Sequence, residues 1–307
     1  MSPQAKTRSG GMSVTIRNEL VAAISEFCGT FMFLFMSFCG AQNAIDSSAN
    51  SPGANSTPNV PTLLYISSCF GMSLAVNVWV FYRLSGGMFN PAVSVALALI
   101  GAITPLRCVI VIIVQLVAGI AAAGMADALT PGPLTVANTL GNGVSKAQGV
   151  FLEMFLTAQL VIVVYFLAVE KHKATFLAPI GVGMSVFMAH MVGVYLTGCS
   201  INPARALGPA VIAGFPGYHW IYWLGPLMGA LLAYAVYKVL TMLEYATANP
   251  GQDGYDWEMN ALQEQWLIHS SPQMHKVGPP TSSDGGAPRP MHGNSYPVHQ
   301  VVVTQDV

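Results

Sequence analysis

Two stretches decide how the rest of this chain is interpreted: SGGMFNPAVS at 85–94 and TGCSINPARALGPAVI at 197–212. Each contains Asn-Pro-Ala and continues into a short apolar piece, 90–101 in the first and 202–213 in the second. Asn is a good N-cap, and Pro suits the first helical position because its missing N–H would be unpaired there. A 12-residue helix is about 18 Å long and crosses only about half of a bilayer. Both pieces are therefore predicted to be half-helices that begin at their Asn.

The composition around these stretches indicates a membrane protein. Of the 307 residues, 53% are hydrophobic and 8% are charged, and the mean hydropathy is +0.54. A soluble domain carries about 25% charged residues. With 12 Lys and Arg and a net charge of −1, the chain lacks the basic face of a nucleic-acid-binding protein, so no nucleic-acid partner is expected. The predicted class is an all-α membrane protein in contact with the lipid bilayer.

Long apolar runs organise the chain into two repeats. The runs of spanning length cover 20–42, 62–82, 104–126, 148–169, 174–197 and 219–243. Their continuous rather than alternating pattern disfavours a β-barrel. The order is span, span, half-helix, span in repeat one (about 20–126) and again in repeat two (about 148–243). Three crossings per repeat make the second copy inverted, so the two half-helices point their N-termini at each other near the midplane.

The distribution of basic residues predicts the orientation and the boundaries of the channel domain. The first connection, 43–61, has no Lys or Arg and is expected outside, and its sequon at Asn55 is either a glycosylation site or a chance match. We expect a cytoplasmic N-terminal tail at 1–19, a channel domain at 20–245 and a disordered cytoplasmic tail at 246–307. The third connection has only Lys146, and the fifth has only Arg205, inside the half-helix. The N-terminal tail, the second and fourth connections and the end of the last span carry the other basic residues of the argument: Lys6, Arg8, Arg17, Arg83, Arg107, Lys171, Lys173 and Lys238.

The two Asn-Pro-Ala motifs are the predicted centre of a pore. Each half-helix N-terminus carries roughly +0.5 charge, which repels cations and protons but not neutral molecules. The amide N–H groups of the two Asn are expected to face the lumen, where a passing water molecule accepts from both and a proton wire is broken. The alternative, that both Asn are only helix caps, stays open. The motif residues are Asn90, Pro91, Ala92, Asn202, Pro203 and Ala204.

Three ionisable residues are predicted inside the membrane. Arg205 follows the second motif, and an intramembrane Arg is functional by default. It offers donors to a passing solute, or alternatively binds backbone carbonyls only. Glu26 and Glu153 recur at the same place in the two repeats. They are predicted to be buried carboxylates that accept hydrogen bonds from the re-entrant loops, and Gln115 and Gln159 are expected to act similarly.

Catalytic chemistry has no support in the sequence. Phosphate loops, HExxH and dense carboxylate clusters are missing. The five Cys are odd in number and match no zinc pattern. We therefore expect neither an enzyme nor a metal or cofactor site.

Together with HWIYWLGPLMGALLA at 219–233, the two stretches make the chain similar to the aquaporin (major intrinsic protein) family over about 20–243. The resemblance implies six membrane helices plus two half-helices around one pore per subunit, and homotetramers. It also implies a selectivity filter at four positions, which are Phe70, His190, Cys199 and Arg205. The filter resembles that of the water-selective branch, because the glycerol branch tends to replace the His by Gly and to carry Asp where this chain has Ala206. Cys199 is then a pore-lining thiol or an inert small residue.

The resulting prediction is a passive water channel in the plasma membrane that excludes protons and ions.

 The prediction names water as the permeant, moving down an osmotic gradient. Two alternatives stay open: an aquaglyceroporin-type pore for glycerol or another small neutral solute, and a secondary transporter, since inverted repeats with broken helices also build those. A transporter would need an acidic ion site at the midplane. The tails resemble those of fungal members in length and composition.

Overall fold

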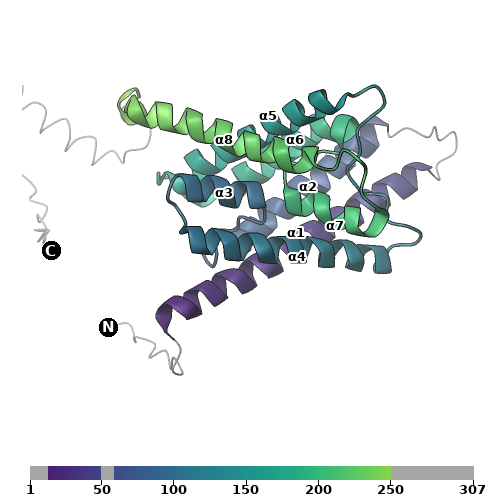
Figure 1. The fold of residues 1–307 in the computed structure, drawn as a ribbon, viewed down its shortest axis with the longest axis horizontal. Helices are drawn as coiled ribbons and strands as arrows, with labels where there is room; N and C mark the ends of the chain where they lie inside the picture. The colour runs from purple at the N-terminus through teal and green to yellow at the C-terminus, as the bar shows by residue number, and fades with distance from the viewer. Residues whose placement is uncertain (1–12, 50–58, 250–307) are drawn as a thin grey trace, which may run out of the picture. The chain divides into compact units, whose positions relative to one another are not determined.

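The computed structural model describes residues 13–49 and 59–249, and these ranges are helical with turns and loops between the helices. Asn55 and most of the two predicted tails lie outside the described residues. Figure 1 shows the long helices side by side, with α3 and α7 between them. In chain order the elements are α1 (Val14–Ala49), α2 (Val60–Phe81), α3 (Pro91–Leu99), α4 (Pro105–Leu129), α5 (Lys146–Val164), η1 (Tyr165–Val169), η2 (Thr175–Leu177), α6 (Ala178–Thr197), α7 (Pro203–Ala213), α8 (Ile221–Met242) and η3 (Tyr245–Thr247).

Six helices in the described part of the chain are long and apolar enough to cross a membrane. The predicted all-α class with six spans and two half-helices is confirmed. The main difference is at α1, which has 36 residues where the sequence predicts a span over 20–42. It begins at Val14, inside the predicted N-terminal tail, because the polar residues that flank the apolar run include no helix-breaking Pro.

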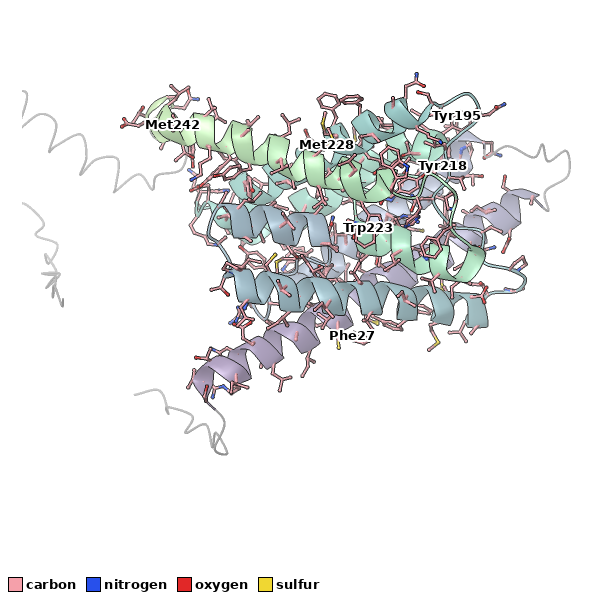
Figure 2. All side chains as sticks on the ribbon, in the orientation of Figure 1. Phe27, Tyr195, Tyr218, Trp223, Met228 and Met242 are labelled. Carbon is pink, nitrogen blue, oxygen red and sulfur yellow. The ribbon has the colours of Figure 1, made fainter. Side chains whose placement is uncertain are left out.

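The outer faces of these helices are apolar. Large hydrophobic side chains such as Met32, Val76 and Phe155 are more than 40% exposed, as lipid-facing residues would be. Figure 2 shows Tyr195 and Tyr218 at one end of the bundle and Met242 at the other. Because six spans return the chain to its starting side, α1 begins and α8 ends at the same end of the bundle, which we call the terminal side.

Both half-helices begin where the sequence predicts. The Asn90 side chain caps α3 by accepting from the Ala92 N–H at 2.9 Å, and the Asn202 side chain caps α7 by accepting from the Ala204 N–H at 2.9 Å. In Figure 1, α3 extends toward the terminal side and α7 toward the opposite side. Their N-termini therefore meet in the interior of the bundle.

Glycines allow the helices to approach closely where they cross. α2 packs on α6, α1 on α4 and α5 on α8. A Cβ atom on Gly183 of α6 would lie 2.6 Å from the Gly71 carbonyl oxygen of α2. Small residues at such crossings are the usual means of close helix packing in membranes.

Candidate functional site

A cavity runs through the interior of the bundle and is lined by residues of both repeats. Phe70, His190 and Arg205 line it at one end, and Asn90 and Asn202 line its middle. Its other end, on the terminal side, is lined by Tyr82, Gly86, Ala168 and Ala178, among other residues. The cavity is thus lined by both motif Asn residues and by three of the four predicted filter residues.

The two motif Asn residues join the repeats at the middle of this cavity. The Asn90 Nδ2 donates to the Ile201 carbonyl oxygen at 2.8 Å, and the Asn202 Nδ2 donates to the Phe89 carbonyl oxygen at 2.8 Å. Each side-chain oxygen is used by its own half-helix cap. A side-chain amide has two N–H donors, so one N–H of each Asn remains for a molecule in the cavity.

Two buried carboxylates hold the loops that carry the motifs. Glu26 of α1 is fully buried and accepts from the backbone N–H groups of Met88 and Phe89, at 3.0 and 2.9 Å. It also accepts from the Ser85 hydroxyl at 2.6 Å and from the Gln115 amide at 2.8 Å. Four donors therefore surround one carboxylate, which is the geometry of a structural anchor.

The second repeat has a corresponding anchor. Glu153 of α5 is also fully buried and accepts from the backbone N–H groups of Ser200 and Ile201, at 2.9 and 2.6 Å. The Thr197 hydroxyl donates to it at 2.6 Å. Gln159 differs from the expectation, because its side chain is exposed on the outer face of α5 rather than buried beside a loop.

Phe70, His190 and Arg205 contact one another at one end of the cavity. The rings of Phe70 and His190 are stacked with their centroids 4.1 Å apart. The guanidinium carbon of Arg205 lies 5.0 Å from the centroid of the Phe70 ring. Three residues that are far apart in the sequence, from α2, α6 and α7, therefore form one cluster at this end of the cavity, which we call the constriction.

The constriction presents one acceptor and one donor without a protein partner. The His190 Nδ1 lies 2.9 Å from the Val186 carbonyl oxygen, and since a carbonyl only accepts, the proton is on Nδ1. In the neutral imidazole, Nε2 of His190 is then an acceptor. Within the described residues, this atom and Nε of Arg205 are buried without a hydrogen-bond partner. A small molecule that both donates and accepts is the natural partner of such a pair.

Arg205 is also held by the protein. Its Nη1 donates to the Val136 carbonyl oxygen at 2.9 Å, and its Nη2 donates to the Gly198 carbonyl oxygen at 3.3 Å. Both roles predicted for Arg205, donation to a passing solute and binding to backbone carbonyls, are therefore compatible with its position. Binding to carbonyls orients the guanidinium group, and Nε is left for a solute.

The fourth predicted filter residue lies differently. Cys199 is fully buried and is not among the residues that line the cavity. A Cβ atom on Gly193 of α6 would be 3.1 Å from its Sγ, so the thiol packs against α6. The left-handed φ of 47° at Cys199 directs the side chain there. Gly193 is about one helical turn beyond His190, which keeps the thiol next to the constriction.

Several residues of the site carry no local signal in the sequence. Phe38 of α1 is fully buried, and its ring centroid is 5.7 Å from the guanidinium carbon of Arg205. Val136 lies in the loop between α4 and α5 and supplies a carbonyl to Arg205. At the other end, the Tyr165 hydroxyl donates to the Ala96 carbonyl oxygen near the end of α3, at 2.7 Å. Only contacts across the fold bring these residues to the cavity.

The sequence pattern described as Major intrinsic protein matches residues 13–237. The chain belongs to the major intrinsic protein family. The chain is therefore an integral membrane channel for small molecules, and the family is not one of enzymes. The predicted resemblance to this family is confirmed, and the predicted similarity to fungal members is consistent with the relatives below.

Fungal aquaporins are among the similar proteins. The chain is 62% identical over 239 residues to "Aquaporin-1" of Gibberella zeae, which covers 78% of this chain and 74% of that protein. It is 55% identical over 240 residues to "Aquaporin-7" of Botryotinia fuckeliana, covering 77% of this chain and 53% of that protein. The chain thus spans between half and three quarters of the length of these two relatives.

A solved structure has the same fold. The aquaglyceroporin from Plasmodium falciparum superposes with a TM-score of 0.61 and covers 73% of this chain and 100% of its own. The two sequences are 18% identical, so this likeness concerns the fold alone.

Proposed function

We propose that this major intrinsic protein is a passive water channel that excludes protons and ions. The observation that carries the proposal is the constriction of Phe70, His190 and Arg205, with its unpartnered acceptor and donor. A water molecule fits both atoms, because it donates one hydrogen bond to His190 Nε2 and accepts one from Arg205 Nε. The positive charge of Arg205 repels cations from the same point.

Proton exclusion would arise at the middle of the cavity. Each motif Asn retains one amide N–H, and the two half-helix N-termini add a positive potential of roughly half a charge each. A water molecule that accepts from both Asn has its own hydrogens directed away from them. Neighbouring water molecules on either side are then oriented oppositely, and a proton cannot hop through the file.

The two alternatives find less support. A glycerol pore is less supported, because the bulky rings of Phe70 and His190 and the guanidinium group of Arg205 all line the same end of the cavity. A secondary transporter needs an acidic site for its coupling ion, but the carboxylates of Glu26 and Glu153 already accept four and three hydrogen bonds from the protein. Water is therefore the permeant that we propose.

The first experiment compares water and glycerol flux in vesicles that contain the purified full-length chain, by stopped-flow light scattering. We expect osmotic shrinkage much faster than in empty vesicles and no acceleration of glycerol entry. The double variant His190→Gly, Arg205→Val should admit glycerol, because both groups that narrow the constriction beside Phe70 are removed. Met191→Ala is the matched control, since Met191 follows His190 but is exposed on the outer face of α6.

Two results would contradict the proposal. Water flux equal to that of empty vesicles, with correctly folded protein, would contradict a water channel. Continued exclusion of glycerol by the double variant would show that these residues are not the filter.

We also propose a homotetramer in the plasma membrane with both ends of the chain in the cytoplasm. The side chain of Gln159 supports assembly, because an exposed amide within a spanning helix needs a polar partner that lipid does not offer. The orientation is supported by the basic residues at the terminal side, where Arg17, Arg83, Arg107 and Lys171 lie at or beyond helix ends. The mass of the detergent-solubilised protein tests the number of subunits.

A further inference from the structure

The loop between α4 and α5, residues 130–145, is attached to the rest of the protein at several points. The Leu134 N–H donates to Asp127 at 3.1 Å, and the Leu140 N–H donates to the Tyr218 hydroxyl at 3.2 Å. Between these two attachments lies Val136, whose carbonyl accepts from Arg205. The position of this carbonyl therefore depends on how the middle of the loop is held.

Gln42 of α1 holds the middle of the loop. Its Oε1 accepts from both the backbone N–H and the hydroxyl of Thr135, at 2.8 and 3.1 Å. Its Nε2 donates to Asp46, one turn further along α1, at 3.0 Å. Gln42 is 1% exposed, so its amide is oriented by protein contacts rather than by water. Thr135 directly precedes Val136, and the bond from Gln42 is thus one residue away from the carbonyl that binds Arg205.

The other supports of Arg205 belong to other segments, although Gly198 packs against Asn138 and Thr139 of the loop. Gly198 belongs to the turn after α6, where its N–H is bonded to the Val194 carbonyl at 3.1 Å. Phe70 and Phe38 are buried within spanning helices. The bond to Val136 is the shorter of the two bonds between the guanidinium group and carbonyls, and it is the one attached to a loop. Loosening the loop would therefore release one side of the guanidinium group.

We propose that Gln42 is a positioning residue for selectivity, acting through Thr135 and Val136 on Arg205. The inference rests on the proposed function, because it takes Arg205 as part of the filter. When Gln42 is removed, Arg205 loses its fixed partner in a fraction of the molecules. The channel then exists in two forms, one with Arg205 in place and one with Arg205 displaced. Water passes through both forms, whereas a larger neutral solute such as urea passes mainly through the form with a displaced Arg205.

The test uses the full-length chain in vesicles, with urea as the probe and water flux as the reference. Gln42→Leu keeps the approximate size of the side chain and removes the acceptor. The variant removes both hydrogen bonds from Thr135. The net contribution of one typical hydrogen bond already corresponds to about a tenfold change in the population of the displaced form, so urea permeability should rise about tenfold or more. Water permeability should change little. Asn43→Leu is the matched control, because Asn43 is the next residue of α1 and is exposed.

Two further variants separate positioning from a general loss of structure. Gln42→Glu retains an oxygen that accepts from Thr135 and should restore part of the urea exclusion. Thr135→Val removes only the hydroxyl bond at an exposed site and should raise urea permeability less than Gln42→Leu, which keeps the test available if the latter fails to fold.

A double variant decides whether the effect passes through Arg205. In the background of Arg205→Val, Gln42→Leu should add no further increase in urea permeability. An equal factor in both backgrounds, or urea exclusion by Gln42→Leu equal to the wild type, would overturn the inference. Wild-type vesicles without accelerated water flux would instead contradict the proposed function, so the two failures are distinguishable.

Discussion

At the scale of the residue, the side chains of Asn90 and Asn202 each form two different kinds of hydrogen bond. The oxygen of each amide caps its own half-helix, and the nitrogen donates to a carbonyl of the opposite repeat. An Asp could form the cap but has no N–H for the bond across the cavity. The cap and the link between the repeats therefore both require Asn. The hypothesis that the two Asn residues are only helix caps does not account for the hydrogen bonds that they donate across the cavity.

Cys199 allows a prediction at this scale. A mercurial bound to its Sγ would occupy space between α6 and the turn that precedes Asn202, next to His190. We expect mercurial inhibition of water flux in the wild type and none in Cys199→Ser, with equal basal permeability. Cys28→Ser is the control, because this thiol is exposed on the outer face of α1 and its removal should leave the inhibition intact. Inhibition that persists in Cys199→Ser would show that the mercurial acts at a different residue.

At the scale of elements, close helix crossings keep the cavity in shape. α2 and α6 supply Phe70 and His190, and they cross at Gly71 and Gly183, where an added Cβ on Gly183 would lie 2.6 Å from a carbonyl oxygen. Any side chain at this crossing separates the two helices. The stacking of Phe70 on His190 depends on the same separation, so packing at this crossing affects the shape of the proposed filter.

Gly183→Ala should therefore destabilise the protein. Overpacking at a close contact costs about 1–3 kcal/mol, and we expect a lower melting temperature in detergent, measured by the loss of the monodisperse peak after heating. Gly124→Ala is the matched control in another spanning helix, since its added Cβ would meet only the Ile212 side chain at 4.0 Å. Equal melting temperatures for both variants would contradict the role of the α2–α6 crossing.

At the scale of the whole molecule, the described residues contain the cavity and the anchors of both half-helices. Beyond α8, the ring of Tyr245 packs against that of Phe166, with the ring centroids 5.3 Å apart. We infer that the chain up to this point suffices for conduction and that the remainder of the C-terminal tail is dispensable for the pore.

Truncation tests this inference. A chain that ends after Ala248 keeps Tyr245 and should conduct water as well per subunit as the full-length protein. A chain that ends after Leu243 loses the contact with Phe166 and should melt at a lower temperature. If the chain that ends after Ala248 folds but does not accelerate vesicle shrinkage, the tail is required for conduction rather than being merely regulatory.

The sequence by itself determined the elements of this protein. Continuous apolar runs define spans, and Asn-Pro marks the starts of the half-helices, because span length and helix capping are local properties. The family spacing also located Phe70, His190 and Arg205, which the fold brings together. The limits of α1 were less predictable, since polar residues without a breaker extend a helix beyond the membrane.

Only the tertiary structure decided which groups meet around the cavity. Contacts between segments that are distant in the sequence determine three features. They are the hydrogen bond from Arg205 to Val136, the hydrogen bonds from Thr135 to Gln42 and the exposed position of Gln159. The direction of the Cys199 thiol likewise follows from a left-handed backbone and a glycine on another helix. A local pattern specifies where a helix begins and how long it is, but the partner of a side chain is set by the packing of the whole bundle.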